Sequence, residues 1–256
     1  MWKDTTENEA LLGVSFTGIA DANGIITAEW LKEGAKLAIE VNEKYAKKLG
    51  IKPAARVTAI KPEGSSSCVL GSSSGIHARH SKYYLRRVRM NENEALAAYL
   101  KASIPDLVEA DKYSANTIVV TIPQESPDNA IVKDNETAQS LFKRAMLYNR
   151  NWVKPGHKDG DNRHNVSCTI SVRESEWDEL KESMWEHRDL YSGISLLPFD
   201  GGTYEQAPFE ACGKETYDKY MELVKDVDLK QVMEMEDNTN RMEIIACAGG
   251  ACEIPV

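Results

Sequence analysis

Two cysteines near the end of the chain, Cys247 and Cys252, have the residue type and spacing for redox chemistry. The residues between them are small, and Gly249 and Gly250 let the backbone fold back so that the two sulfurs can form a disulfide. Such a dithiol suits thiol–disulfide exchange, in which a thiolate must reach a disulfide that it does not permanently contact. Two unpaired thiols are the alternative. No second Cys or His pair stands nearby to complete four zinc ligands, so we predict no metal site.

The segment before this pair, residues 226–241, is rich in charged and amide side chains and has little apolar periodicity. Such a composition is typical of a mobile arm rather than of a packed helix or strand. An arm of this kind would let the two thiols move between a buried disulfide and an external reductant. We find no linker that divides the chain before residue 226.

A second candidate site is the loop at residues 61–67, which has the sequence Lys-Pro-Glu-Gly-Ser-Ser-Ser. It follows a predicted strand and precedes residues 68–70, which are predicted to begin a helical turn. Glycine lets the backbone approach a ligand, and free N–H groups with three hydroxyls at the start of a helix can bind a phosphate. A Gly/Ser turn without a ligand is the alternative interpretation.

The composition of the chain indicates an intracellular protein. It has 256 residues, 42% of them hydrophobic, but no apolar run is long enough to cross a bilayer. The N-terminus has no apolar signal core, so we expect a cytoplasmic protein without membrane contacts. In that reducing compartment a paired cysteine motif is more often redox-active than structural. The net charge of −9 argues against direct nucleic-acid binding, although the basic cluster at residues 86–89 can contact a small anion or solvate a strand end.

Predicted strands and helices alternate along the chain. Runs of β-branched and other apolar residues predict strands at residues 11–19, 56–60, 83–90, 117–122, 165–172 and 194–199. Helical spacing predicts helices at residues 27–49, 91–100, 136–152, 174–187 and 214–227, the first begun by Thr27 and ended by Gly50. This alternation favours an α/β fold with a mainly parallel sheet or barrel, and we expect residues 11–19, 56–60 and 117–122 among its strands.

Several motifs follow one another in an order that is more specific than any one of them. They are Gly13-Val14-Ser15-Phe16-Thr17-Gly18-Ile19, Lys61-Pro62-Glu63-Gly64-Ser65, Gly75-Ile76-His77, Tyr83-Tyr84-Leu85-Arg86-Arg87-Val88-Arg89, Asn165-Val166-Ser167-Cys168, Leu196-Leu197-Pro198-Phe199 and Tyr204-Glu205-Gln206-Ala207-Pro208-Phe209-Glu210. With the terminal Cys-x4-Cys pair, this series resembles the C-terminal part of class II ribonucleotide reductases. More narrowly, it resembles the monomeric, adenosylcobalamin-dependent ribonucleoside-triphosphate reductases. The likeness covers nearly the whole chain.

This resemblance implies a fold, an activity and partners. Residues 1–225 would form the C-terminal portion of a ten-stranded α/β barrel of the ribonucleotide reductase type, and residues 226–256 a flexible redox tail. The enzyme would convert ribonucleoside triphosphates to 2′-deoxyribonucleotides by thiyl-radical chemistry with adenosylcobalamin as cofactor. Cys247 and Cys252 would re-reduce the active site and would then be reduced by a thioredoxin-like protein.

The resemblance also gives a role to the loop. In this family the loop holds the substrate phosphates, so Pro62, Gly64, Ser65, Ser66 and Ser67 would bind them. Glu63 stands where the family usually has a small hydroxyl residue, and its carboxylate would repel a polyphosphate unless it is turned away. We therefore assign binding to the loop backbone and to the hydroxyls beside it. Cobalamin contacts are expected within residues 165–210, where simple packing of residues 204–210 is the alternative.

Parts of the family's catalytic apparatus are missing from the sequence. The radical cysteine of the family lies in an Asn-Pro-Cys-x-Glu loop, and this motif does not occur here. Cys68 and Cys168 lie in apolar contexts typical of core thiols, and Cys212 is expected in a loop. We therefore expect the final third to half of a reductase, from a split gene or as a truncated sequence.

Such a chain should be inactive unless an N-terminal reductase polypeptide supplies the radical cysteine. Two alternatives remain open. The chain could be a stand-alone redox or phosphate-binding protein that uses the tail dithiol for another purpose. It could also be a non-catalytic remnant that still folds and binds reductase partners.

Overall fold

The computed structural model describes residues 2–158, 162–199, 201 and 204–234, and these fall into two compact units. Unit 1 contains residues 2–79 and 129–199, and unit 2 contains residues 80–128 and the described residues from 201 to 234. Each unit has its own hydrophobic core. The expected boundary between a domain at residues 1–225 and a tail at residues 226–256 stays a prediction.

Unit 1 is built on chain segments that run parallel to one another. Val14 bridges Thr58, and Ile60 bridges Val166, both in parallel. The last of these segments continues into β4 (Thr169–Val172), which pairs in parallel with β5 (Ser195–Pro198). The predicted α/β fold with parallel pairing is therefore confirmed for this unit.

The predicted strands at residues 11–19 and 56–60 are wrong in length, because the structure forms only single bridges there. Beyond Val14 the chain leaves its parallel neighbour: the N–H groups of Gly18 and Ile19 donate to Ser73 O and Gly75 O, at 2.8 and 3.1 Å. These backbone groups are thus used to hold another loop. Closure into a ten-stranded barrel stays a prediction.

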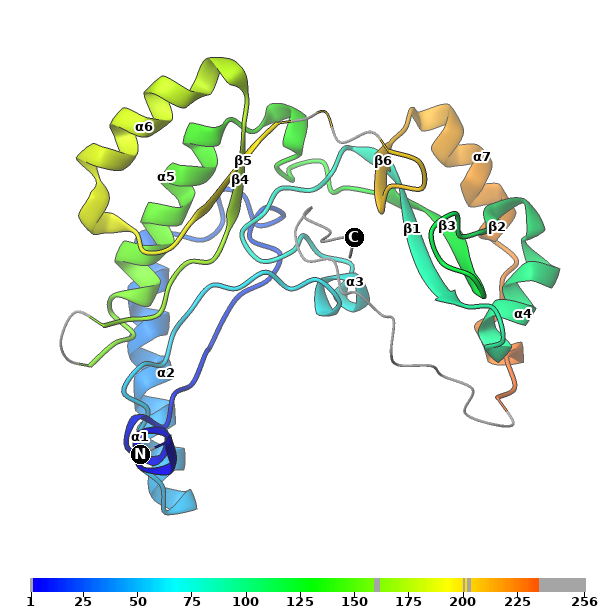
Figure 1. Cartoon of the computed structure of the whole chain (residues 1–256). Coiled ribbons are helices and arrows are strands. Elements are labelled where there is room, and N and C mark those ends of the chain that lie inside the picture. The colour runs from blue at the N-terminus through cyan, green and yellow to red at the C-terminus, as the bar shows by residue number, and fades with distance from the viewer. Residues whose placement is uncertain (1, 159–161, 200, 202–203, 235–256) are drawn as a thin grey trace. The chain divides into compact units, whose positions relative to one another are not determined.

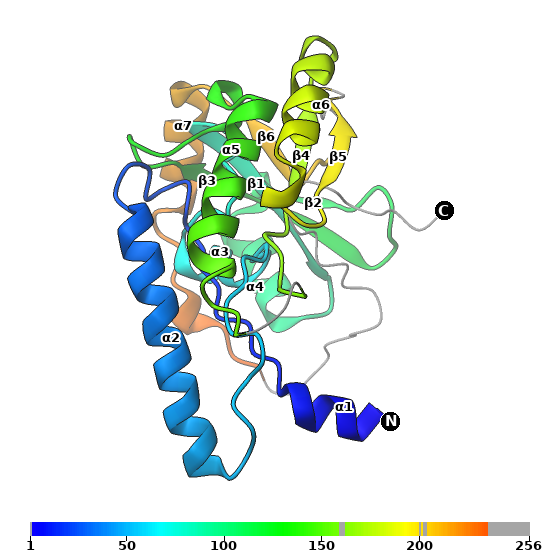
Figure 2. The same ribbon diagram turned by 90° about the vertical axis from the view of Figure 1, so that its left-hand side faces the viewer.

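Three helices pack against these segments: α2 (Ala28–Leu49), α5 (Ala138–Tyr148) and α6 (Trp177–Glu186). Figure 1 shows α5 and α6 beside β4 and β5, and Figure 2 shows the length of α2. The helix predicted at residues 27–49 is confirmed, because the Thr27 side chain accepts the Trp30 N–H at 3.1 Å and Gly50 ends the helix with φ +68°. The core contains the fully buried side chains of Leu31, Ile60, Ile76, Phe142, Ile170 and Leu180.

Helix α5 continues into a π-helical turn, Asn149–Val153, that inserts the Trp152 indole into unit 1. Its Nε1–H donates to Ala59 O at 3.1 Å and lies 3.3 Å from Val14 O. In return, the Thr58 hydroxyl donates to Trp152 O at 2.7 Å. One side chain therefore joins the helical layer to two of the parallel segments.

Two short helices lie at the surface of unit 1. The sequence does not predict α1 (Trp2–Glu9), which projects from the unit (Figure 2) and is attached through an Arg56–Glu9 ion pair and a Lys52–Asn8 hydrogen bond. The other helix, α3 (Ser66–Leu70), is the turn predicted after the Gly/Ser loop.

Unit 2 is an antiparallel sheet with the strand order β2-β3-β1-β6. Its strands are β1 (Tyr83–Asn91), β2 (Val108–Ala110), β3 (Thr117–Glu125) and β6 (Phe209–Ala211). Helices α4 (Ala95–Ser103) and α7 (Lys214–Val224) pack on one face of this sheet through the second core (Figure 1).

The strand predicted at residues 117–122 exists, but its placement among the strands of the parallel sheet or barrel is wrong. It lies antiparallel to β1, with Tyr83 opposite Glu125 and Asn91 opposite Thr117. Its run of four consecutive buried residues, 118–121, is compatible with either direction, so the local pattern does not distinguish them. The strand also passes through Pro123, which is tolerated because β2 pairs with β3 only at residues 118–120.

Two further boundaries differ from the prediction. The helix predicted from Asn91 begins at Ala95, because Asn91 Oδ1 accepts the Asn93 N–H at 2.9 Å and forms a turn first. The beginning of the predicted mobile arm is packed: Val227 contacts the core of unit 2, and the Asp228 N–H donates to the Tyr99 hydroxyl at 2.9 Å. Residues 235–241 of that arm lie outside the described residues.

Residue Gln206 fastens the segment before β6 to the sheet of unit 2. Its Oε1 accepts the Lys112 N–H and its Nε2 donates to Ala110 O, both at 2.9 Å. Its carbonyl accepts from Arg89 at 3.1 Å, although its backbone is left-handed with φ +55°. Only 6% of the residue is exposed. This supports packing as the role of residues 204–210.

Among the described helices, none combines the length and the apolar composition that a membrane crossing requires.

Replacing Gln206 should destabilise unit 2. Gln206→Ala removes both side-chain hydrogen bonds of a residue that is only 6% exposed, at a cost of about 0.5–1.5 kcal/mol for each bond. The measurement is hydrogen exchange of the β1 and β3 amides, because every tryptophan of the chain lies in unit 1. The exposed Gln231→Ala is the matched control, and equal exchange in both variants would contradict the assignment.

Candidate functional site

The predicted phosphate loop, residues 62–67, lies in unit 1 and leads directly into α3. Ser65 and Ser66 are exposed, whereas Ser67 is buried. Among the described residues, the backbone N–H groups of Gly64, Ser65 and Ser66 have no hydrogen-bond acceptor. These three N–H groups are therefore available to an anion.

The two ends of the loop are held close together. The Lys61 N–H donates to Ser15 Oγ at 3.1 Å, and the Glu63 N–H donates to Ser74 Oγ at 3.0 Å. At Gly75 the chain crosses back over Lys61 with φ +53°, and a Cβ there would stand 2.4 Å from Lys61 O. Only glycine permits this crossing, and it keeps the base of the loop narrow.

The return segment, residues 71–75, is fixed by an ion pair that the sequence analysis missed. Arg79 donates from Nε and Nη2 to the two carboxylate oxygens of Asp21, each at 2.8 Å, and from Nη2 to Gly71 O at 2.6 Å. The Ser73 N–H also donates to Asp21, at 2.8 Å. A bidentate, largely buried pair of this kind is directional, so it fixes the position of the segment.

The side chains of the loop are not equally available. The Ser66 hydroxyl donates to the Glu63 carboxylate at 2.8 Å, and the buried Ser67 hydroxyl lies 3.4 Å from Gly64 O. Among the described residues, the Ser65 hydroxyl has no partner. The Glu63 carboxylate is therefore engaged with Ser66 rather than turned away from the loop, and the backbone N–H groups are the donors that remain.

The described cysteines lie in three different environments. Cys168 is the core thiol that was predicted, and burial raises its pKa to about 12. Cys68 is not a core thiol: it is exposed on α3, because this five-residue helix buries only Ser67, and its thiol donates to Gly64 O at 2.8 Å. Cys212 is half-buried just after β6, where burial raises its pKa. Cys247 and Cys252 lie outside the described residues.

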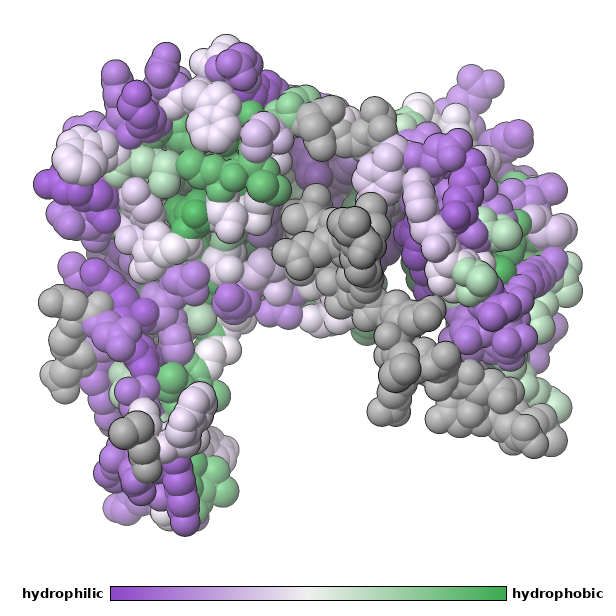
Figure 3. Space-filling model, in the orientation of Figure 1, coloured by the Kyte–Doolittle hydropathy of each residue, from purple (hydrophilic) through white to green (hydrophobic). Residues whose placement is uncertain are grey.

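We tested whether residues 165–210 fit a corrin ring. Within this range Gln206 is occupied by the sheet of unit 2, as shown above. In unit 1 a groove of about 390 Å³ lies between α6 and β5 and is lined mainly by apolar side chains, among them Leu180, Met184 and Trp185. Figure 3 shows hydrophobic side chains gathered over β5. Asp178 and Lys181 also line this groove. The expected cobalamin contacts within residues 165–210 stay a prediction.

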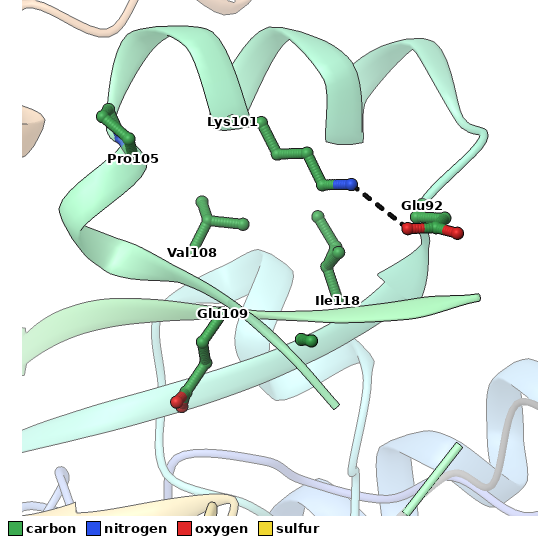
Figure 4. A pocket seen from close by; sticks show the side chains of 7 residues that line it. Glu92, Lys101, Pro105, Val108, Glu109 and Ile118 are labelled. Atoms are coloured by element: carbon green, nitrogen blue, oxygen red, sulfur yellow. Dashed lines mark hydrogen bonds and ion pairs between the residues drawn. The ribbon is translucent and has the colours of Figure 1, made fainter. Parts of the chain in front are cut away.

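A second cavity, of about 260 Å³, lies in unit 2 beside α4 and β2 (Figure 4). Lys101 and Glu92 form an ion pair across it at 3.3 Å, and Val108 and Ile118 supply apolar walls. Lys101 and Glu92 thus satisfy each other, and Figure 4 shows the Glu109 carboxylate on the opposite side of its strand, directed away from them. The part of the chain that the structure describes also contains no cluster of three or more potential metal ligands.

The chain resembles one kind of enzyme in its sequence. It is 30% identical over 227 residues to the adenosylcobalamin-dependent ribonucleoside-triphosphate reductase of Lactobacillus leichmannii, covering 86% of the chain and 29% of that protein. It is 30% identical over 240 residues to the enzyme of the same name from Lactobacillus acidophilus, covering 92% of the chain and 31% of that protein. No protein-family model matches the chain.

The fold has a counterpart among solved structures. The crystal structure of a B12-dependent (class II) ribonucleotide reductase matches with a TM-score of 0.75 and 24% sequence identity, over 90% of the chain and 35% of that structure. The fold is thus that of part of a class II ribonucleotide reductase. Over most of its length the chain is homologous to adenosylcobalamin-dependent ribonucleoside-triphosphate reductases, as the sequence motifs predict. It spans about 30% of the length of these relatives.

The described thiols should differ in reactivity. At pH 7 the exposed Cys68 should be alkylated by iodoacetamide first, Cys212 more slowly, and Cys168 only after unfolding, because a thiol whose pKa is raised to about 12 forms almost no thiolate. Peptide mapping by mass spectrometry at several reaction times gives the order. Labelling of Cys168 in the folded chain at the rate of Cys68 would contradict the buried environment.

Proposed function

We propose that this chain is part of an adenosylcobalamin-dependent ribonucleoside-triphosphate reductase and works together with a polypeptide that supplies the radical cysteine. The enzyme so completed would convert ribonucleoside triphosphates to 2′-deoxyribonucleotides. Homology over 86–92% of the chain supports the assignment. The structural observation that carries it is the loop at residues 62–67, whose base is closed and whose N–H groups are free.

In this proposal the loop binds the substrate phosphates. The N–H groups of Gly64, Ser65 and Ser66 donate to phosphate oxygens, assisted by the Ser65 hydroxyl. Pro62 limits the backbone freedom at the start of the loop, and the buried Ser67 supports its far end. The exposed side chain of Lys61, next to the loop, offsets part of the repulsion between phosphate and the Glu63 carboxylate.

Cys247 and Cys252 act in the proposal as an electron shuttle. A thiolate of the pair attacks the disulfide that each turnover leaves in the active site and forms a mixed disulfide. The second thiolate then closes the Cys247–Cys252 disulfide and releases two reduced active-site thiols. A thioredoxin-like protein reduces the pair again. We assign the radical cysteine to the complementing polypeptide, and no step through it or through adenosylcobalamin is derived from this chain.

Enlarging two loop residues should weaken phosphate binding. In Gly64→Val/Ser65→Leu, the phosphate loses charge-assisted hydrogen bonds, and each lost bond should raise Kd by about tenfold or more. The measurement is isothermal titration of the chain with tripolyphosphate. The matched control is Ser192→Leu/Gly193→Val, an exposed Ser-Gly pair of unit 1 with open space around Gly193. Equal affinities of both variants and the unmodified chain for tripolyphosphate would show that the loop is a turn that does not bind phosphate.

Removing either tail thiol should stop repeated turnover. Once the chain is combined with its complementing polypeptide, Cys247→Ser or Cys252→Ser should retain a first turnover after pre-reduction but lose turnover sustained by thioredoxin. Dithiothreitol should restore part of the rate, because a small dithiol can enter an active site that a protein cannot. The measurement is deoxynucleotide formed per enzyme, with Cys212→Ser as the control. Sustained turnover with thioredoxin in both tail variants, or turnover by this chain alone, would refute the proposed roles.

A further inference from the structure

The imidazole of His77 lies between the phosphate loop and β4, inside unit 1. The residue is only 9% exposed. Its Nε2 lies 3.1 Å from the backbone N of Thr169, and its Nδ1 lies 3.3 Å from Ser74 O. An amide N–H can only donate, so Nε2 must accept, and the neutral ring then carries its proton on Nδ1 and donates it to Ser74.

This ring is connected to the loop through Ser74. The Ser74 carbonyl accepts from the ring and from the His77 N–H, the latter at 3.0 Å. The Ser74 hydroxyl accepts the Glu63 N–H at 3.0 Å, immediately before the free N–H groups of the loop. A continuous series of hydrogen bonds therefore runs from β4 to the loop.

The surroundings of His77 keep the ring neutral. Burial lowers its pKa from the ordinary 6.5 and outweighs the hydrogen bond to Ser74, which raises the pKa; the positive charges of Arg144 and Lys133 lower it further. Arg144 on α5 donates to Ile76 O at 3.1 and 3.2 Å and pairs with the Glu136 carboxylate, which offsets part of its charge. The thiol of Cys168, beside Thr169, has a raised pKa and is uncharged. In this setting the single tautomer persists through neutral pH.

We propose that His77 is the positioning residue of the phosphate loop, the group that holds Ser74, and through it Glu63, in the arrangement that points the loop N–H groups at a phosphate. The inference rests on the proposed function of the loop. It gives a role to a residue of the Gly75-Ile76-His77 motif that neither the sequence analysis nor the proposed function uses. His77 itself does not contact the phosphate in this proposal.

Lowering the pH tests the proposal, because a positioning role and a purely electrostatic role of His77 predict opposite changes in phosphate affinity. An imidazolium ring carries N–H groups on both nitrogens, so Nε2–H would face the Thr169 N–H and the hydrogen bond to β4 would be lost. Phosphate binding should then weaken as the pH falls through the pKa of His77, which burial places below the ordinary 6.5. A histidine that acted only through its charge would strengthen binding in the same range.

Two variants separate the two ends of the connection. In His77→Gln the side-chain oxygen can still accept from Thr169, but the donor to Ser74 is lost; in His77→Asn the donor is kept and the acceptor is lost. Each should raise the Kd for tripolyphosphate about fivefold at pH 7.5, the equivalent of one neutral hydrogen bond. Each variant should also lose the weakening of tripolyphosphate binding at low pH that protonation of His77 causes in the unmodified chain. His164→Gln, which removes a histidine bonded to Leu12 O, is the matched control.

Measurements on the unmodified chain keep the test independent of variant folding. Nitrogen NMR should show His77 with an unprotonated Nε2 at pH 7.5, and exchange of the Glu63 amide should accelerate as that nitrogen becomes protonated. A doubly protonated ring at pH 7.5 would overturn the inference, and so would a Glu63 amide exchange rate that does not change when His77 becomes protonated. So would folded His77 variants that bind tripolyphosphate like the unmodified chain while the Gly64→Val/Ser65→Leu variant does not. Absence of binding by the unmodified chain would instead refute the proposed function of the loop.

Discussion

The hydrogen bonds of one buried tryptophan organise unit 1. Trp152 reaches Ala59 O and Val14 O with a single N–H, and its own carbonyl accepts from Thr58. Trp152 is 2% exposed and Thr58 is 1% exposed, so each polar group has to find its partner inside the protein. The indole adds to the backbone hydrogen bonds that already join these two segments, in which the Val14 N–H donates to Val57 O and the Ala59 N–H donates to Val14 O. The phosphate loop starts where the second of these segments ends.

In the proposed phosphate site, backbone N–H groups rather than cationic side chains are the groups that would contact the phosphate. The chain has a net charge of −9, and Glu63 places a carboxylate within the loop itself. In the proposed role, a phosphate would depend on fixed N–H dipoles, whose direction has to be held in advance. Here the direction is held by the Gly75 crossing, the Ser74 hydroxyl and the Asp21–Arg79 pair. The polar residues around the loop are thus explained by orientation more than by charge.

The described cysteines are three free thiols in different environments. Cys168 is buried and has a raised pKa, which is the setting of an inert core thiol. Cys212 follows the last strand of unit 2, and Cys68 donates to the loop backbone. None of them has the sequence surroundings of the family's radical cysteine. The chain spans about 30% of the length of its relatives.

The sequence by itself determined the features that depend on local physics. The helix at residues 28–49 follows from its apolar spacing, its Thr27 cap and its Gly50 end. The strand predicted at residues 83–90 is found as β1, Tyr83–Asn91. The order of motifs was enough to indicate the family. Helix caps and apolar spacing depend on residues that are close in the sequence, so they can be recognised without knowing which segments pack together in the fold.

Only the tertiary structure decided direction, pairing and burial. The β3 pattern fits a parallel or an antiparallel neighbour equally well, and contact with β1 decided for the latter. Cys68 has apolar neighbours in the sequence, but α3 is too short to bury them. The roles of His77, Arg79 and Gln206 depend on partners 58 to 96 residues away, and no local pattern reports such distant contacts. The reason is physical: hydrogen bonds and ion pairs are decided by what the fold brings within about 3 Å, whatever the distance along the chain.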